Sequence, residues 1–220
     1  MAAPELFKLC SLLLQYPDER LVEARSELVE AAAVLGRGGP ERLLREGCER
    51  WASVEPEALR ADYVDTFDFK RSNSLYLTYH SYGDRRERGM ALVSLKQRYE
   101  AVGLALETGE LPDFLPLMLE FRALVPEQGS EALIEHREAL EVLHDGLASA
   151  NSLWAPVVAA ACGALPRMTR KQRQRAERMM AEGPPEEQVG LEPFAPPEVM
   201  PPAASDGGAL PLGAPVRAGS

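Results

Sequence analysis

Apolar and polar residues recur with a helical period along most of the chain. Between residues 19 and 35 apolar side chains are spaced by three or four positions, and glutamates occupy the opposite face. Similar apolar stripes cover residues 92–102 and 133–147, and residues 157–165 are apolar on all sides. No convincing run of alternating strand residues is present. The pattern predicts an all-α fold, a single-domain bundle of about seven to nine helices, with residues 157–165 as a central buried helix.

Residues with capping and first-turn preferences lie where these helices are expected to begin. Asp18 is a candidate N-cap for the helix after it, and Thr169 for a basic helix over residues 170–181. Pro40 and Pro56 suit first-turn positions, because proline lacks only a backbone N–H that the first turn leaves unbonded. The glycines at 36–39 predict a stop before Pro40.

The last 38 residues differ sharply in composition from the rest. Residues 183–220 contain 9 of the 18 prolines, 6 of the 17 glycines and one aromatic residue, Phe194. Such a segment cannot bury enough apolar surface to offset the entropy lost on ordering. We expect a folded domain over residues 1–182 and a disordered tail over residues 183–220.

The charge balance is acidic, with 24 Lys and Arg against 34 Asp and Glu and a net charge of −10. This balance argues against a general nucleic-acid partner, because phosphate contacts need an excess of cations. Six basic residues between Arg167 and Arg178 could offer a nucleic-acid or membrane surface. Glu177 and Glu182 interrupt or flank them and no aromatic residue stacks among them, so a solvated helix face is favoured.

Targeting and redox signals point to the cytoplasm. The apolar run over residues 6–14 lacks the basic flank and cleavage site of a signal peptide. The longest apolar stretch, residues 153–165, is shorter than the roughly 20 residues that span a bilayer. Three widely spaced cysteines exclude a disulfide scaffold and fit a reducing compartment. We therefore expect a cytoplasmic protein with no stable membrane insertion.

The chain lacks the common sequence motifs of catalysis and cofactor binding. There is no Gly-rich phosphate loop, no nucleophile elbow and no paired-histidine zinc motif. His136 and His144 share a helix face but lie eight residues apart, roughly 12 Å along the axis, so they cannot hold one metal ion. The expectation is a protein that is not an enzyme and has no catalytic residue, bound metal or cofactor of its own.

Aromatic residues gather in one segment, residues 63–82. It contains Tyr63, Phe67, Phe69, Tyr76, Tyr79 and Tyr82, which are six of the 14 aromatic residues, around a polar interruption. Tyrosine combines apolar area with a polar tip, so such a helix–loop–helix suits a groove that accepts another chain. The alternative is that these rings only pack the bundle interior, and for Phe67 and Leu75 the two interpretations are equally favoured.

The same segment carries a family resemblance. Residues 63–104, YVDTFDFKRSNSLYLTYHSYGDRRERGMALVSLKQRYEAVGL, and residues 110–121, ELPDFLPLMLEF, resemble the NarJ family of nitrate reductase assembly chaperones. The opening LLLQYPDERL at residues 12–21 is similar to the start of that family. The resemblance covers about residues 5–180 and places the chain with the TorD-like redox-enzyme maturation proteins.

This resemblance implies an all-helical, TorD-like fold, a cytoplasmic location and a protein that catalyses no reaction of its own. It implies binding to the N-terminus of the catalytic (alpha) subunit of respiratory nitrate reductase while the molybdenum cofactor is inserted. The wider group has a Pro-Asp-His signature. Here Pro112 and Asp113 match it, and Phe114 stands in the place of the histidine.

The predicted peptide-binding site joins the aromatic segment to this second motif. Its members are Tyr63, Asp65, Phe67, Asp68, Phe69, Leu75, Tyr76, Tyr79, Tyr82, Pro112, Asp113 and Glu120. The tyrosines would form the groove, and carboxylates such as Asp113 would meet basic peptide residues at its rim. Two alternatives remain open: a chaperone for an exported molybdoenzyme with a twin-arginine signal, and an enzyme or nucleotide binder acting on the cofactor. The second would need a phosphate cradle.

Overall fold

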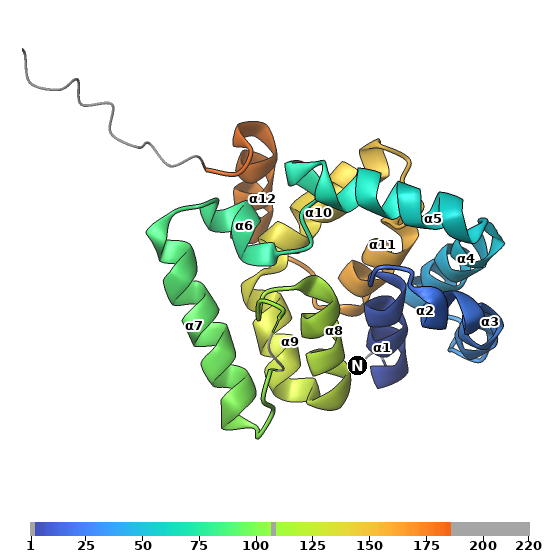
Figure 1. The fold of residues 1–220 in the computed structure, drawn as a ribbon. Helices are drawn as coiled ribbons and strands as arrows, with labels where there is room; N and C mark the ends of the chain where they lie inside the picture. The colour runs from blue at the N-terminus through green and yellow to red at the C-terminus, as the bar shows by residue number, and fades with distance from the viewer. Residues whose placement is uncertain (1–2, 107–108, 186–220) are drawn as a thin grey trace, which may run out of the picture. The chain divides into compact units, whose positions relative to one another are not determined.

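The computed structural model describes residues 3–106 and 109–185. The chain divides into two units, residues 1–187 and 188–220, and all described residues belong to the first. Twelve α-helices and two short helical turns make up this part of the chain (Figure 1). They are α1 (Pro4–Leu13), α2 (Glu19–Glu23), α3 (Arg25–Ala33), α4 (Gly39–Ser53), α5 (Pro56–Tyr63), the π turn η1 (Val64–Asp68), the 3₁₀ turn η2 (Arg71–Asn73), α6 (Leu77–Tyr82), α7 (Arg86–Ala101), α8 (Leu115–Leu124), α9 (Pro126–Glu135), α10 (Arg137–Ser149), α11 (Ala155–Ala164) and α12 (Arg170–Glu182).

The all-α prediction is confirmed, but the expected number of helices was too low. The stripe over residues 19–35 forms two helices that meet at Ala24, and the stripe over residues 133–147 is divided between α9 and α10 at His136. At both junctions a single residue leaves helical geometry, with ψ of 4° at Ala24 and 21° at His136. A one-residue break hardly disturbs the spacing of apolar positions, so the periodicity did not indicate it.

The predicted helix starts are confirmed. The carboxylate of Asp18 accepts a hydrogen bond from the Leu21 N–H at 2.9 Å, and Pro40 and Pro56 lie in the first turns of α4 and α5. Thr169 and Gln172 form a capping box at the start of α12. The helix α12 ends at Glu182, one residue beyond the predicted helix over residues 170–181, and the predicted tail beyond Pro185 lies outside the described residues.

The helix α11 is the buried centre of the bundle. It packs against α4, α10 and α1, and α1 packs in turn against α8 (Figure 1). Gly47 on α4 allows a close approach, because a Cβ atom there would lie 2.9 Å from the Val157 side chain on α11. Trp154, just before α11, is fully buried and its indole N–H donates to the Leu13 carbonyl at 2.9 Å. The apolar stripe over residues 157–165 is therefore central, as predicted.

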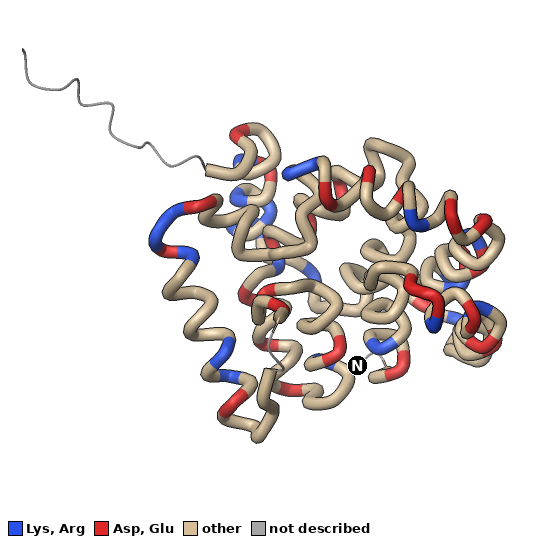
Figure 2. Tube along the Cα trace, in the orientation of Figure 1, with Lys and Arg blue, Asp and Glu red and all other residues tan. Residues whose placement is uncertain are grey.

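Charged residues are distributed unevenly along the described chain (Figure 2). Lys and Arg of α12 are exposed, and Arg175 lies 3.8 Å from Glu138 on α10. Ala176, on the opposite face of α12, is buried against the bundle. This is the solvated basic face expected from the sequence. Across residues 3–106 and 109–185, no helix has the length and apolar character needed to cross a bilayer.

Candidate functional site

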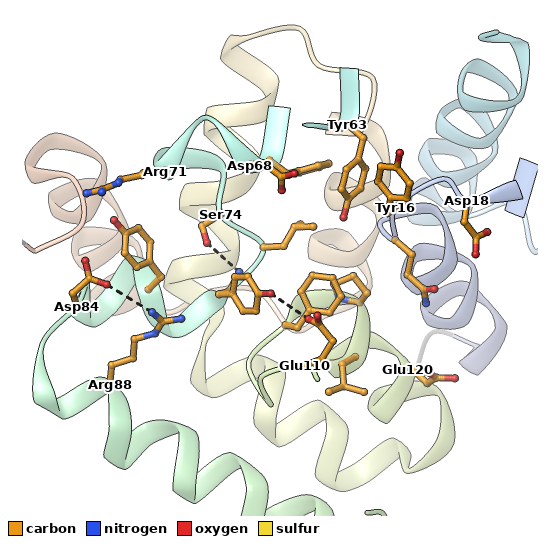
Figure 3. Close-up of a pocket in the computed structure, with 18 residues that line it drawn as sticks. Tyr16, Asp18, Tyr63, Asp68, Arg71, Ser74, Asp84, Arg88, Glu110 and Glu120 are labelled. Carbon is orange, nitrogen blue, oxygen red and sulfur yellow. Dashed lines mark hydrogen bonds and ion pairs between the residues drawn. The ribbon is translucent and has the colours of Figure 1, made fainter. Parts of the chain in front are cut away.

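A groove of about 980 Å³ opens between the aromatic segment, the loop before α2 and the α8 region (Figure 3). Seven of the twelve predicted site residues line it: Tyr63, Phe67, Asp68, Leu75, Tyr76, Tyr79 and Glu120. Six of them come from residues 63–79 and Glu120 comes from α8, and the fold brings these two segments to one surface. The structure thus gathers most of the predicted set around a single concave surface.

Tyr63 anchors the inner wall of the groove. Its ring centroid lies 4.8 Å from that of Phe67 and 5.5 Å from those of Tyr16 and Trp154. Its hydroxyl donates to the Leu14 carbonyl at 3.1 Å, and burial raises the pKa of this phenol. Tyr63 and Phe67 are buried and also line the groove, so both rings pack against the core and form part of the concave surface.

A short backbone pairing joins the two halves of the site. The Leu77 N–H donates to the Asp113 carbonyl at 3.1 Å, and the Leu115 N–H donates to the Leu75 carbonyl at 2.8 Å. Between them Tyr76 faces Phe114, and their ring centroids lie 5.4 Å apart. Phe114, in the place of the wider group's histidine, is therefore an apolar wall of the groove.

Asp113 does not lie at the rim, which corrects the expected role of this carboxylate. It is fully buried, and one of its oxygens accepts hydrogen bonds from the Thr78 N–H at 3.1 Å and the Thr78 hydroxyl at 2.5 Å. Arg88 lies 3.8 Å from the same oxygen and donates to the Thr78 hydroxyl at 3.2 Å. Arg88 also approaches Asp84 and lies over the Tyr79 ring. Asp113 thus fixes α6 and α7 behind the groove and cannot meet a peptide.

Four other predicted members lie outside the groove lining. Pro112 is buried, and its carbonyl accepts a hydrogen bond from the Tyr99 hydroxyl at 3.1 Å. Asp65 and Phe69 are exposed, and Phe69 keeps 76% of its surface in solvent. Tyr82 is half-buried at the end of α6.

Several lining residues were not predicted. Sequence reasoning missed Gln15, Tyr16, Asp18, Arg71, Ser74, Asp84, Arg88, Glu110, Phe114, Pro116 and Leu117. Tyr16 and Asp18 stand within the LLLQYPDERL opening, and Glu110 and Phe114 within the second motif. These motifs were available signals, but nothing in local periodicity indicates that residues 15–18 lie opposite residues 110–120.

The groove combines carboxylates with neutral phenols. Five carboxylates line it (Asp18, Asp68, Asp84, Glu110 and Glu120), with the guanidinium groups of Arg71 and Arg88. Burial and then Glu110 raise the pKa of Tyr76 to about 12, so its hydroxyl stays protonated and donates to Glu110 at 3.2 Å. Glu120 pairs with Lys8 on α1. The lining residues include no histidine or cysteine.

His80 supports the groove from behind. Its Nε2 lies 2.8 Å from the carbonyl oxygen of Ser74, a lining residue, and burial lowers the pKa of the imidazole. A neutral ring can donate from Nε2 to this carbonyl and thereby hold the loop before Tyr76. His80 therefore acts on the shape of the groove and does not touch its contents.

One cluster of possible metal ligands lies away from the groove. Glu141, His144 and Asp145 on α10 place one ligand atom each within 4.8 Å of one another. His136, which shares a helix face with His144, is not part of this cluster. None of the three lines the groove.

Residues 18–160 match the family model of the nitrate reductase delta subunit. The chain belongs to this family. The match spans the aromatic segment and the second motif and confirms the resemblance found in the sequence.

Curated relatives carry names that agree with this assignment. The chain is 43% identical over 133 residues to the nitrate reductase molybdenum cofactor assembly chaperone NarJ of Bacillus subtilis, covering 59% of this chain and 70% of that protein. It is 39% identical over 125 residues to Escherichia coli NarJ, covering 56% and 52%. It is 37% identical to the nitrate reductase-like protein NarX of Mycobacterium tuberculosis, covering 71% of this chain and 24% of NarX. The chain thus spans about half of E. coli NarJ and a quarter of NarX.

The names of the NarJ relatives describe an assembly chaperone, which confirms the prediction that the protein is not an enzyme. A crystal structure of a redox enzyme maturation protein from Archaeoglobus fulgidus matches with a TM-score of 0.55 and 23% identity, covering 73% of this chain and 91% of that one. This likeness supports the fold alone, and it agrees with the predicted TorD-like bundle.

Proposed function

We propose that the protein is a cytoplasmic chaperone dedicated to respiratory nitrate reductase. It binds the N-terminal segment of the catalytic (alpha) subunit and holds that subunit competent while the molybdenum cofactor is inserted. The observation that carries the proposal is the groove of about 980 Å³, which is lined by tyrosines and carboxylates and built from the segments that match the family.

The chemistry of the groove supports an amphipathic, basic peptide as its occupant. Tyr63, Phe67, Tyr76 and Phe114 offer apolar faces for one side of a helix. The carboxylates of Asp18, Asp68 and Glu110 can meet lysine or arginine side chains at the edges. Phenols keep a polar tip, so such a groove tolerates water when it is empty.

The experiment is a calorimetric titration of the full chain with a synthetic peptide of the N-terminal segment of the catalytic subunit. A scrambled peptide of the same composition is the control for non-specific charge attraction. A twin-arginine signal peptide tests the alternative client, an exported molybdoenzyme. Saturable binding of the catalytic-subunit peptide alone supports the proposal. Tighter binding of the twin-arginine peptide would instead identify an exported molybdoenzyme as the client.

Cofactor insertion needs a cellular test. In cells lacking the chaperone, the nitrate reductase catalytic subunit should accumulate with little bound molybdenum. Supplying the wild-type chain should restore the metal content. Unchanged molybdenum content in those cells would separate peptide binding from any role in cofactor insertion.

A further inference from the structure

The two ends of the groove carry different charges. In Figure 3 Arg71, Arg88 and Asp84 lie at one end, next to α6 and the start of α7. Asp18 and Glu120 lie at the other end, beside α1 and α8. Asp68 and Glu110 lie between these two groups. The cations of the lining are therefore confined to one end.

Existing ion pairs sharpen this asymmetry. At the cationic end Arg88 is already shared among Asp84, Asp113 and the Tyr79 ring. Arg71 is exposed and has no ion pair within residues 3–106 and 109–185, so its charge is available to a ligand.

At the acidic end Glu120 is paired with Lys8. Asp18 caps α2 through the Leu21 N–H but has no cationic partner among the described residues. No other described side chain therefore compensates the carboxylate of Asp18, which lines this end of the groove. Arg71 and Asp18 are the two end charges that a bound chain would meet.

From this polarity we infer that the groove binds its peptide in one direction, with the peptide N-terminus at Asp18 and its C-terminal end at Arg71. A helix carries partial positive charge at its N-terminus and partial negative charge at its C-terminus. The free α-amino group of a chain terminus adds to the first of these. The reverse orientation would place like charges together at both ends. This inference rests on the proposed function, because it concerns the direction of the same peptide.

End-group chemistry tests the inference without changing the fold. Peptides with a free or acetylated N-terminus are titrated against the wild type and Asp18→Asn, since Asn keeps the N-cap and removes the charge. Acetylation should weaken binding to the wild type about two- to fivefold more than it weakens binding to Asp18→Asn. The helicity that acetylation adds to the free peptide is the same for both proteins and cancels in this comparison.

The cationic end has the matching experiment. Peptides with a free or amidated C-terminus are titrated against the wild type and Arg71→Gln. Amidation should weaken binding to the wild type by a similar factor, about two- to fivefold, more than to Arg71→Gln. The inferred direction would be overturned if acetylation and amidation weakened binding to the wild type and to the matching variant equally. It would also be overturned if each modification weakened binding to the variant more than binding to the wild type.

Distances between spin labels give a second, independent readout. Nitroxides are placed at Glu19→Cys, beside Asp18, and at Ser72→Cys, beside Arg71; both positions are exposed and the three native thiols are buried. A label on the peptide N-terminus should lie nearer the Glu19→Cys label, and a label on its C-terminus nearer the Ser72→Cys label. Reversed or equal distances contradict the direction while leaving peptide binding intact. Absence of binding by every peptide would instead contradict the proposed function.

Discussion

The carboxylate of Asp113 accepts two hydrogen bonds from Thr78, at 3.1 Å from its backbone N–H and 2.5 Å from its hydroxyl. These bonds hold the first turn of α6 against the segment that leads into α8. Tyr76 and Phe114 lie immediately before these two helices. The contact between Asp113 and Thr78 therefore holds the Tyr76 and Phe114 rings at their spacing of 5.4 Å.

Loss of this buried carboxylate should be costly. Asp113→Ala leaves the Thr78 donors and Arg88 without their acceptor, and we expect a loss of about 3 kcal/mol in the free energy of unfolding. Urea unfolding at neutral pH measures it. Asp65→Asn is the control, because Asp65 is exposed and outside the groove. Equal stability of Asp113→Ala and the wild type would contradict the structural role given to this residue.

Local patterns predicted where several helices begin, because capping depends on neighbouring residues. Asp18, Pro56 and Thr169 each begin a helix as expected. The burial of Asp113 could not be predicted in this way, since its partner Thr78 is 35 residues distant in sequence. Apolar and aromatic types indicate burial, whereas a carboxylate is normally exposed unless its partners are known.

The same limit applies to the groove. One wall of the groove could be predicted from the sequence, because aromatic residues are concentrated within the twenty residues 63–82. The opposite side, with Tyr16 and Asp18, comes from a loop whose position depends on how α1 packs against α8 and α11. Packing between distant helices is not contained in any local spacing, so these members were missed.

Variants at two tyrosines can distinguish a role in peptide binding from a role in packing the bundle. Tyr76 lines the groove, whereas Tyr82 lies outside the lining although both were predicted members. We expect Tyr76→Ala to weaken binding of the client peptide by about 2 kcal/mol, roughly 30-fold, mainly through faster dissociation. Tyr82→Ala should bind within about twofold of the wild type. Calorimetry and stopped-flow kinetics measure this, with helical circular dichroism as the folding control. Equal losses for the two variants would place the peptide elsewhere.

The three thiols should be inert in the folded protein. All are buried, and burial raises the pKa of Cys48 to about 11 and that of Cys162 to about 12; it also raises the pKa of Cys10. Thiolate is the reactive form, so a disulfide reagent at pH 8 should modify these residues slowly. Three thiols should react rapidly in guanidinium chloride. Rapid labelling of the native chain would show that one of these helices opens readily.

Acid should destabilise the protein through two buried histidines. Burial lowers the pKa values of His80 and His136 in the folded state below the ordinary value of about 6.5. Below about pH 6.5 these two histidines bind protons in the unfolded chain but remain neutral in the folded chain. The free energy of unfolding therefore falls as the pH decreases from about 6.5 toward 5. Urea titrations across this range measure the slope. His80→Gln should reduce the slope, and an unchanged slope in that variant would assign the effect to other groups.

Two glycines, one at the end of α6 and one inside α7, should respond oppositely to substitution by alanine. Gly83 ends α6 with φ of 56° and ψ of −135°, and a Cβ atom there would lie 1.8 Å from the Pro185 carbonyl oxygen. Gly89, inside α7, has no atom within 4 Å of such a Cβ. Gly83→Ala should therefore lower the free energy of unfolding by at least about 1 kcal/mol.

The matched change, Gly89→Ala, should raise the free energy of unfolding by about 0.5–1 kcal/mol, because alanine costs less backbone entropy in a helix than glycine does. Urea denaturation of the two variants and the wild type measures both effects in one experiment. A further comparison uses the chain truncated after Gly183. Truncation removes the Pro185 contact but leaves the positive φ of Gly83, so part of the cost of Gly83→Ala should disappear and part should persist. If the whole cost persisted, the contact with Pro185 would contribute nothing and the backbone conformation alone would require glycine.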